Sequence, residues 1–189
     1  MEYKELPVYK FNELDETIQD YLIEKEQSFL IEHCFDQDMQ MLKADIVNPV
    51  FGENMTMRYS LSYSQGDGVC LDGDIDLKTL LASNTLTSAS QKLLKRLTHF
   101  DALHSLKYVQ NSRYCHYSTS YIDVIWQCNE PKSTLLHQAL EQLLHEIDNL
   151  KADLCYHLEK WGYDLDYFES AQQHLIDLDQ DYLASGTAV

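Results

Sequence analysis

The chain has 189 residues, of which 44% are hydrophobic, and a formal net charge of −17 at pH 7. The hydrophobic content excludes a wholly disordered chain, and no apolar run reaches the ~20 residues that a membrane-spanning helix needs. The acidic balance disfavours direct binding to DNA or RNA, which requires a basic footprint, and favours a basic partner.

The N-terminal segment predicts a short strand followed by helices. Residues 7–11 (PVYKF) are typical of a strand with proline at its start. A helical spacing of apolar residues predicts a helix near 13–32, and a weaker pattern predicts a second helix near 35–46. The pair Asn48-Pro49 ends this helical region.

The clearest local pattern is a β-hairpin over residues 55–77. Apolar residues occupy the odd positions and polar residues the even ones on both sides of Gly66-Asp67-Gly68, with Gly73 filling one apolar position. Because residues that face each other on one side of an antiparallel pair must have numbers that sum to an even value, the tip must hold an odd number of residues. A three-residue tip places Gln65 opposite Val69 and Arg58 opposite Asp76.

The polar face of this hairpin admits two interpretations. Asp72, Asp74 and Asp76 form a row with Arg58 across from them, and His116 lies near them if a second hairpin is adjacent. These side chains could hold a cation or act as a catalytic carboxylate group. The preferred interpretation is a solvated, charged sheet face that resists aggregation, because same-face neighbours lie roughly 6.6 Å apart.

The central segment predicts a helix and three further strands. Ser88 to Gln91 matches a capping box at the start of a helix that carries Lys92, Lys95 and Arg96. Residues 106–110 and 113–118 flank a plausible turn, and the nearly continuous apolar run Tyr121–Trp126 predicts a central strand. The fold class is therefore α+β, with an antiparallel sheet of about five strands.

The C-terminal segment predicts a helical hairpin. Apolar residues from Leu136 to Trp161 alternate spacings of four and three, which indicates a seam that packs against another helix in the same chain or in a second copy. Residues 165–184 predict a second helix. We expect an α+β core over residues 1–129 and a packed helical hairpin over residues 130–189.

Acidic charge is concentrated at the two ends of the chain. Residues 1–46 carry 12 acidic and 4 basic side chains, residues 47–129 carry 7 of each, and residues 130–189 carry 12 and 3. The predicted partner-binding surface is an acidic face of the C-terminal hairpin. Its members are Asp164, Asp166, Glu169, Asp177, Asp179 and Asp181. The second predicted surface is the polar sheet face with Arg58, Asp72, Asp74, Asp76 and His116.

The sequence lacks recognisable catalytic and cofactor-binding motifs. It contains no G-x-S-x-G, no G-x-x-x-x-G-K-[ST], no G-x-G-x-x-G and no H-E-x-x-H. Its five cysteines are scattered and free of C-x-x-C pairs, which is typical of buried small residues. We expect no cofactor, no bound metal and no catalytic residue. Since the N-terminus lacks the apolar core of a signal peptide, we expect a cytoplasmic location in the host cell.

Several segments resemble a family of small proteins encoded by phages and prophages. These segments are VYKFNELDET, then YSLSYSQGDGVCLDGDI, then RYCHYS, and together they cover about residues 8–126. Many members of this family have no assigned function and some are labelled antitoxin-like. Family members often carry an aromatic residue after G-D-G, where this chain has Val69 and Leu71. The resemblance implies a mobile genetic element, and it supplies no catalytic residue.

Three functions agree with these observations. The first is a phage-derived inhibitor, such as an anti-CRISPR or anti-restriction protein, that presents carboxylates where a nucleic-acid-handling host protein binds phosphates. The second is an antitoxin or regulator that neutralises a basic partner protein. The third is a metal-dependent hydrolase that uses Asp72, Asp74, Asp76 and His116.

Overall fold

The computed structural model describes residues 7–61, 67–100, 102–127, 134–165 and 167–189. The chain forms two compact units: unit 1 comprises Met1–Asp38 and Leu165–Val189, and unit 2 comprises Met39–Asp164. The helices and the antiparallel sheet confirm the α+β fold class. The division differs from the expected boundary at 129/130, because the long C-terminal helix belongs to the same unit as the sheet.

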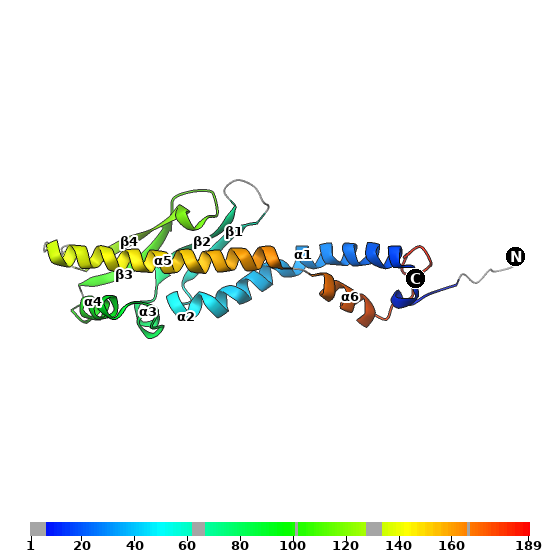
Figure 1. The fold of residues 1–189 in the computed structure, drawn as a ribbon, viewed down its shortest axis with the longest axis horizontal. Coiled ribbons are helices and arrows are strands. Elements are labelled where there is room, and N and C mark those ends of the chain that lie inside the picture. Colours follow the sequence, from blue (N-terminus) through cyan, green and yellow to red (C-terminus); the bar gives the residue numbers. More distant parts are fainter. Residues whose placement is uncertain (1–6, 62–66, 101, 128–133, 166) are drawn as a thin grey trace. The chain divides into compact units, whose positions relative to one another are not determined.

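The sheet of unit 2 is a four-stranded antiparallel meander. Its strands are β1 (Met55–Ser60), β2 (Gly68–Ile75), β3 (Leu103–Gln110) and β4 (Ser120–Trp126), in the order β1-β2-β3-β4 (Figure 1). The expectation of about five strands is high by one. In place of a strand at residues 113–118 lies a connection that ends in the 3-10 helix η2 (Tyr117–Thr119).

The register of the first hairpin differs from the predicted one by six residues along the partner strand, although its parity is as expected. Met57 faces Leu71, and Arg58 faces Cys70 instead of Asp76. Strand pairing ends at Ser60, whose hydroxyl donates a hydrogen bond to Asp67 Oδ1 at 2.7 Å, so a longer connection replaces the three-residue tip. Residues 62–66, including Gln65 and Gly66, lie outside the described residues.

The second strand is shorter than predicted, because Asp76 starts a helix. The Asp76 carboxylate accepts hydrogen bonds from the backbone N–H groups of Lys78 and Thr79, and so caps helix α3 (Leu77–Ala82). An aspartate that accepts bonds from the first free N–H groups of a helix is a favourable N-cap. Asp76 therefore does not belong to a row of strand carboxylates.

One face of the sheet is covered by helices. Helix α5 (Thr134–Asp164) packs against β2, and α4 (Ser88–His99) packs against α5 and β3. The predicted seam of residues 136–161 thus packs against the sheet of its own chain. The cap of α4 is Thr87, one residue before the predicted Ser88. The short helix α2 (Asn48–Phe51) contacts α3.

The strand β4 lies at the edge of the sheet, so the predicted central position is wrong. Its side chains alternate: Tyr121, Asp123 and Ile125 are exposed, and the residues between them are more buried. A continuous apolar run suggested burial on both faces. Only the face toward α5 is covered, and Tyr121 and Ile125 are 50% and 41% exposed.

Unit 1 is built from the two ends of the chain. Helix α1 (Glu16–Ile46) is continuous where two helices were expected, because residues 32–35 include no proline or glycine that would interrupt helical hydrogen bonding. Residues 16–38 of this helix belong to unit 1. The predicted strand at residues 7–11 is absent: Tyr9 forms an isolated bridge with Tyr182, and the 3-10 helix η1 begins at Phe11 and ends at Glu13.

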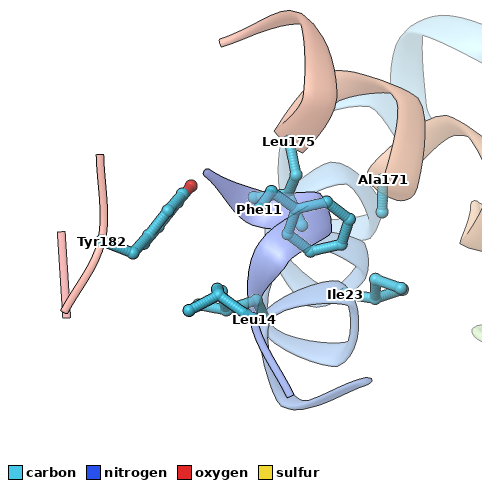
Figure 2. Close-up of a cluster of buried hydrophobic side chains, with 7 residues drawn as sticks. Phe11, Leu14, Ile23, Ala171, Leu175 and Tyr182 are labelled. Carbon is cyan, nitrogen blue, oxygen red and sulfur yellow. The ribbon is translucent and has the colours of Figure 1, made fainter. Parts of the chain in front are cut away.

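The core of unit 1 joins these ends. Helix α6 (Phe168–Asp177) packs against η1, and the shared apolar cluster is shown in Figure 2. Its buried members are Phe11, Leu14, Leu22, Ile23, Ala171, Leu175 and Tyr182. Residues 165–184 therefore do not form the single helix that the sequence predicted, because the chain turns after α6 and pairs Tyr182 with Tyr9.

Gly73 provides a test of the hairpin geometry. Its φ is +120°, and a Cβ atom at this position would overlap the carbonyl oxygen of Asn54, the residue just before the neighbouring strand β1. We expect Gly73→Ala to lower the free energy of unfolding by about 2 kcal/mol or more, measured by urea denaturation. Asp74→Ala, at the next and exposed position, should change it by less than about 0.5 kcal/mol. Equal effects of the two substitutions would show that Gly73 does not have the positive φ and the close contact with Asn54 described above.

The Asp76 cap predicts a pH dependence. Hydrogen bonds from the backbone of Lys78 and from the Thr79 side chain hold the pKa of Asp76 below its usual value. A lowered folded pKa contributes stability above the unfolded pKa of about 3.9, and that contribution is lost as pH falls through the folded pKa. Asp76→Ala should cost about 1 kcal/mol at pH 7, and the difference from wild type should shrink as the pH falls below the unfolded pKa of about 3.9. A pH-independent difference would contradict the charged cap.

Candidate interaction surfaces

The acidic charge of the protein is concentrated in unit 1. Its 63 residues contain 16 Asp and Glu against 3 Lys and no Arg, a net charge of −13. Unit 2 contains 15 acidic and 11 basic residues, a net charge of −4 over 126 residues. The outer parts of the two acid-rich ends, residues 1–38 and 165–189, thus fold into one unit.

The six predicted acidic residues do not form a row on a helical hairpin. Glu169 and Asp177 lie exposed on α6, whereas Asp164 ends α5 in unit 2. Asp166 lies outside the described residues. The helix stops at Asp177 and Asp179 has a positive φ of 45°, which turns the chain away from the helical path. The predicted helical hairpin that was to carry this acidic face is therefore not formed.

The last two predicted acids form ion pairs with the N-terminal segment. Lys10 Nζ lies 3.1 Å from Asp179 Oδ1 and 3.0 Å from Asp181 Oδ1. Hydrogen bonds with Asp181 and then Asp179 raise the pKa of Lys10. All three side chains are well exposed, so the pairs add little stability, but they reduce the charge available to a partner.

Helix α1 supplies acidic residues that the sequence analysis did not single out. Glu16, Asp20 and Glu24 are exposed and lie four residues apart, so they form a row along one side of the helix. Glu32 is also exposed on this helix. The i, i+4 spacing was present in the sequence and could have identified the row.

The second predicted surface does not converge on one site. Arg58 Nη2 pairs with Asp72 Oδ2 at 3.0 Å, and Asp74 faces Lys107 on β3. The His116 ring accepts a hydrogen bond from the backbone N–H of Ser118 as the cap of η2. Among the described residues, no group of three or more His, Cys, Asp and Glu side chains is arranged to hold a metal ion.

A polar groove lies beside Arg58 and Asp72. It opens where β2 and β3 separate after the pair Gly73 and Tyr108, and it has a volume of about 450 Å³. Lys107 also lines this groove. This part of the second predicted surface therefore combines two cations with one carboxylate and is not an acidic row.

The most unusual polar group is Lys151, which lies on α5 and is 1% exposed. Its Nζ atom lies 2.9 Å from the carbonyl oxygen of Ser120, 3.3 Å from the Ser120 hydroxyl and 2.8 Å from Asp148 Oδ1. The Nζ atom also lies 4.5 Å from the centre of the Tyr108 ring. The ammonium group is thus fully hydrogen bonded and joins α5 to the start of β4.

Lys151 was not among the predicted functional residues, because the predicted apolar seam of this helix was defined mainly by its leucines. The predicted seam continued through Leu150 and Leu154, but the buried stripe of α5 runs from Ile147 through Lys151 to Cys155. Extending a spacing of four from Ile147 would have placed a lysine in this stripe.

The cysteine environments agree with a structural role. Burial, followed by the nearby Cys115 thiol, raises the pKa of Cys70 to about 11. Burial also raises the pKa of Cys155 to about 12. Thiols with such raised pKa values are poor nucleophiles near neutral pH. For these two residues the expectation of buried cysteines is confirmed.

Comparison with known proteins found no matching family model, no matching curated protein and no matching solved structure. In the described part of the chain, every helix is too short or too polar to cross a membrane.

Lys151 allows a test of the buried cluster. Lys151→Met should retain much of the packing but leave the Ser120 carbonyl without its donor, so we expect a loss of about 1–3 kcal/mol in the free energy of unfolding. Lys151→Ala also creates a cavity and should cost more. Lys160→Met, at an exposed position of the same helix, is the control and should be nearly neutral. A neutral Lys151→Met would show that the bonds to Ser120 add no stability.

Proposed function

We propose that this protein is a phage-derived inhibitor that uses the acidic surface of unit 1 to bind a basic surface on a nucleic-acid-handling host protein. The observation that carries the proposal is the net charge of −13 in the 63 residues of unit 1. Carboxylates on a folded unit can occupy cationic positions that otherwise bind phosphates. Such a mimic needs no catalytic residue and no cofactor.

The arrangement of charge supports binding more than solubility alone. Solubility requires net charge but no particular distribution, whereas here most of the excess lies in one third of the chain. The row Glu16, Asp20 and Glu24 lies on a helix, so the Cβ atoms of neighbouring members have a regular spacing of roughly 6 Å. A rigid row of this kind pre-organises several ion pairs for one partner.

The two other functions are supported less well. An antitoxin that neutralises a basic toxin would use the same surface, and it differs from the first proposal only in the identity of the partner. The hydrolase is disfavoured by the positions of its proposed residues, since Asp76 and His116 cap helices and Asp72 pairs with Arg58. The resemblance to phage and prophage proteins supports an origin in a mobile element and a site of action in the cytoplasm of the host.

The proposal can be tested with two matched variants that each remove five exposed carboxylates. The unit 1 variant combines Asp20→Asn, Glu24→Gln, Glu32→Gln, Glu169→Gln and Asp177→Asn. The unit 2 variant combines Asp45→Asn, Glu53→Gln, Glu141→Gln, Asp153→Asn and Asp164→Asn. Circular dichroism and thermal unfolding confirm that each variant is folded. Because total charge is equal in the two variants, any difference in binding reports the position of the charge.

The wild-type protein is immobilised, and the bacterial proteins that it retains at low salt are identified and purified. We expect a retained protein that binds nucleic acid, is displaced by double-stranded DNA or RNA, and associates at least about tenfold more slowly with the unit 1 variant than with the unit 2 variant. Association should weaken steeply between 0.1 M and 1 M salt, as the Debye length falls from ~10 Å to ~3 Å. Equal loss in both variants, or binding insensitive to nucleic acid, would contradict the proposal.

A further inference from the structure

The outer side of β4 is open for pairing. Strand β4 is paired with β3 from Ser120 to Trp126, and within the described residues no strand pairs with its other side. An edge strand presents a row of unpaired N–H and C=O groups that can accept another extended chain. This edge lies in unit 2 and is independent of the proposed role of unit 1.

The hydrogen-bond pattern identifies which backbone groups face outward. The N–H of Asn111 donates to the carbonyl oxygen of Thr119, and the N–H of Gln127 donates to the carbonyl oxygen of Ala102. Since an antiparallel ladder alternates, the odd-numbered residues of β4 bond to β3, and Ile122 and Val124 direct their backbone groups outward.

One outward group is already occupied. The carbonyl oxygen of Ser120 belongs to the outward set and accepts a hydrogen bond from the buried Nζ atom of Lys151 at 2.9 Å. Lys151 thus satisfies the first outward carbonyl of β4. Ile122 and Val124 lie beyond this point, and the free part of the edge is therefore the segment from Ile122 to Trp126.

A groove lies beside this edge. Its volume is about 460 Å³, and its walls come from the start of β4 and from α5. The lining is mostly apolar, with Tyr117, Tyr121, Ile122 and Leu144, and Asp148 adds a carboxylate. Tyr117 and Tyr121 are 42% and 50% exposed, so the free edge coincides with exposed aromatic surface.

The charges around the edge select its partner. Asp123 is exposed at the centre of β4 on the open face of the sheet, and it ends a cross-strand row in which Lys107 of β3 lies between Asp74 of β2 and Asp123. The row therefore has an excess of negative charge, with a carboxylate at its β4 end. Asp148 at the groove is already paired with Lys151. A second copy of the chain would bring another −17 charges, and full antiparallel overlap of two β4 strands would place Asp123 against Asp123.

We propose that β4 binds an extended basic segment of a partner protein by strand addition, with apolar side chains of that segment over the groove and a Lys or Arg opposite Asp123. Backbone bonds to Ile122 and Val124 would hold the segment, and the alternating side chains would select it. The interaction needs no rearrangement of β3 or α5, because the bonds it uses are on the free side.

The probe is a short fluorescent peptide of alternating lysine and valine, compared with a peptide in which glutamate replaces lysine. Fluorescence anisotropy should show at least about tenfold tighter binding of the lysine peptide to the full-length protein. Asp123→Lys should reverse this preference. Val124→Pro removes an outward N–H without removing a bond to β3, and it should weaken binding of the lysine peptide by about tenfold or more. Thermal unfolding verifies that both variants are folded.

Hydrogen exchange locates the bound peptide, since the acidic unit 1 also attracts cations. We expect new protection at the amides of Ile122 and Val124 in wild type, and none in Val124→Pro. Protection confined to unit 1, absence of binding, or an unchanged preference in Asp123→Lys would overturn the inference. Concentration-dependent dimerisation that Val124→Pro abolishes would also overturn it, by assigning the edge to a second copy. Loss of the unit 1 carboxylates should leave the protection of β4 amides intact, so this result and the proposed function can fail separately.

Discussion

The fold of unit 2, residues 39–164, depends on the burial of one face of the sheet beneath α5. The face presents Met55 and Met57 from β1 and Leu71 from β2, and the helix contributes Ile147 and Leu158 to the same core. A four-stranded sheet without this cover would expose a continuous apolar surface, which is unstable in water. Because side chains alternate along a strand, each strand must keep the register that directs its apolar side chains toward the helix.

Lys151 makes this packing specific. A cation placed among apolar side chains is costly unless it is paired, and here the ring of Tyr108, the carboxylate of Asp148 and two oxygens of Ser120 surround it. A shift of α5 along the sheet by one turn would move the ammonium group about 5.4 Å from these partners. The hydroxyl of Tyr108 on β3 donates to the carbonyl oxygen of Ile147 on α5. The helix thus donates a hydrogen bond to β4 through Lys151 and accepts one from β3.

Local periodicity predicted the elements of unit 2 better than their arrangement. Alternation identified β1, β2 and their buried face, and helical spacing identified α4 and α5, because these patterns depend on neighbours in sequence. The register of β1 with β2 and the edge position of β4 depend on contacts between distant segments. The local sequence around Val69 or Ile122 is compatible with the predicted arrangement and with the observed one. Unit 1 was missed for the same reason: Phe11 and Leu175 belong to one core although 164 positions separate them in the printed sequence.

The joining of the two ends also brings many like charges together in unit 1. Its core is small, and its like charges repel one another. Lys10 bridges Asp179 and Asp181, and His174 lies 2.6 Å from Glu26, so the contacts between the two ends include Lys10, one of the two lysines described in this unit. A cationic partner would relieve the remaining repulsion. Because a ligand that binds only the folded form stabilises it by mass action, unit 1 should gain stability from a basic surface, and the same charge that weakens it alone would then favour the complex.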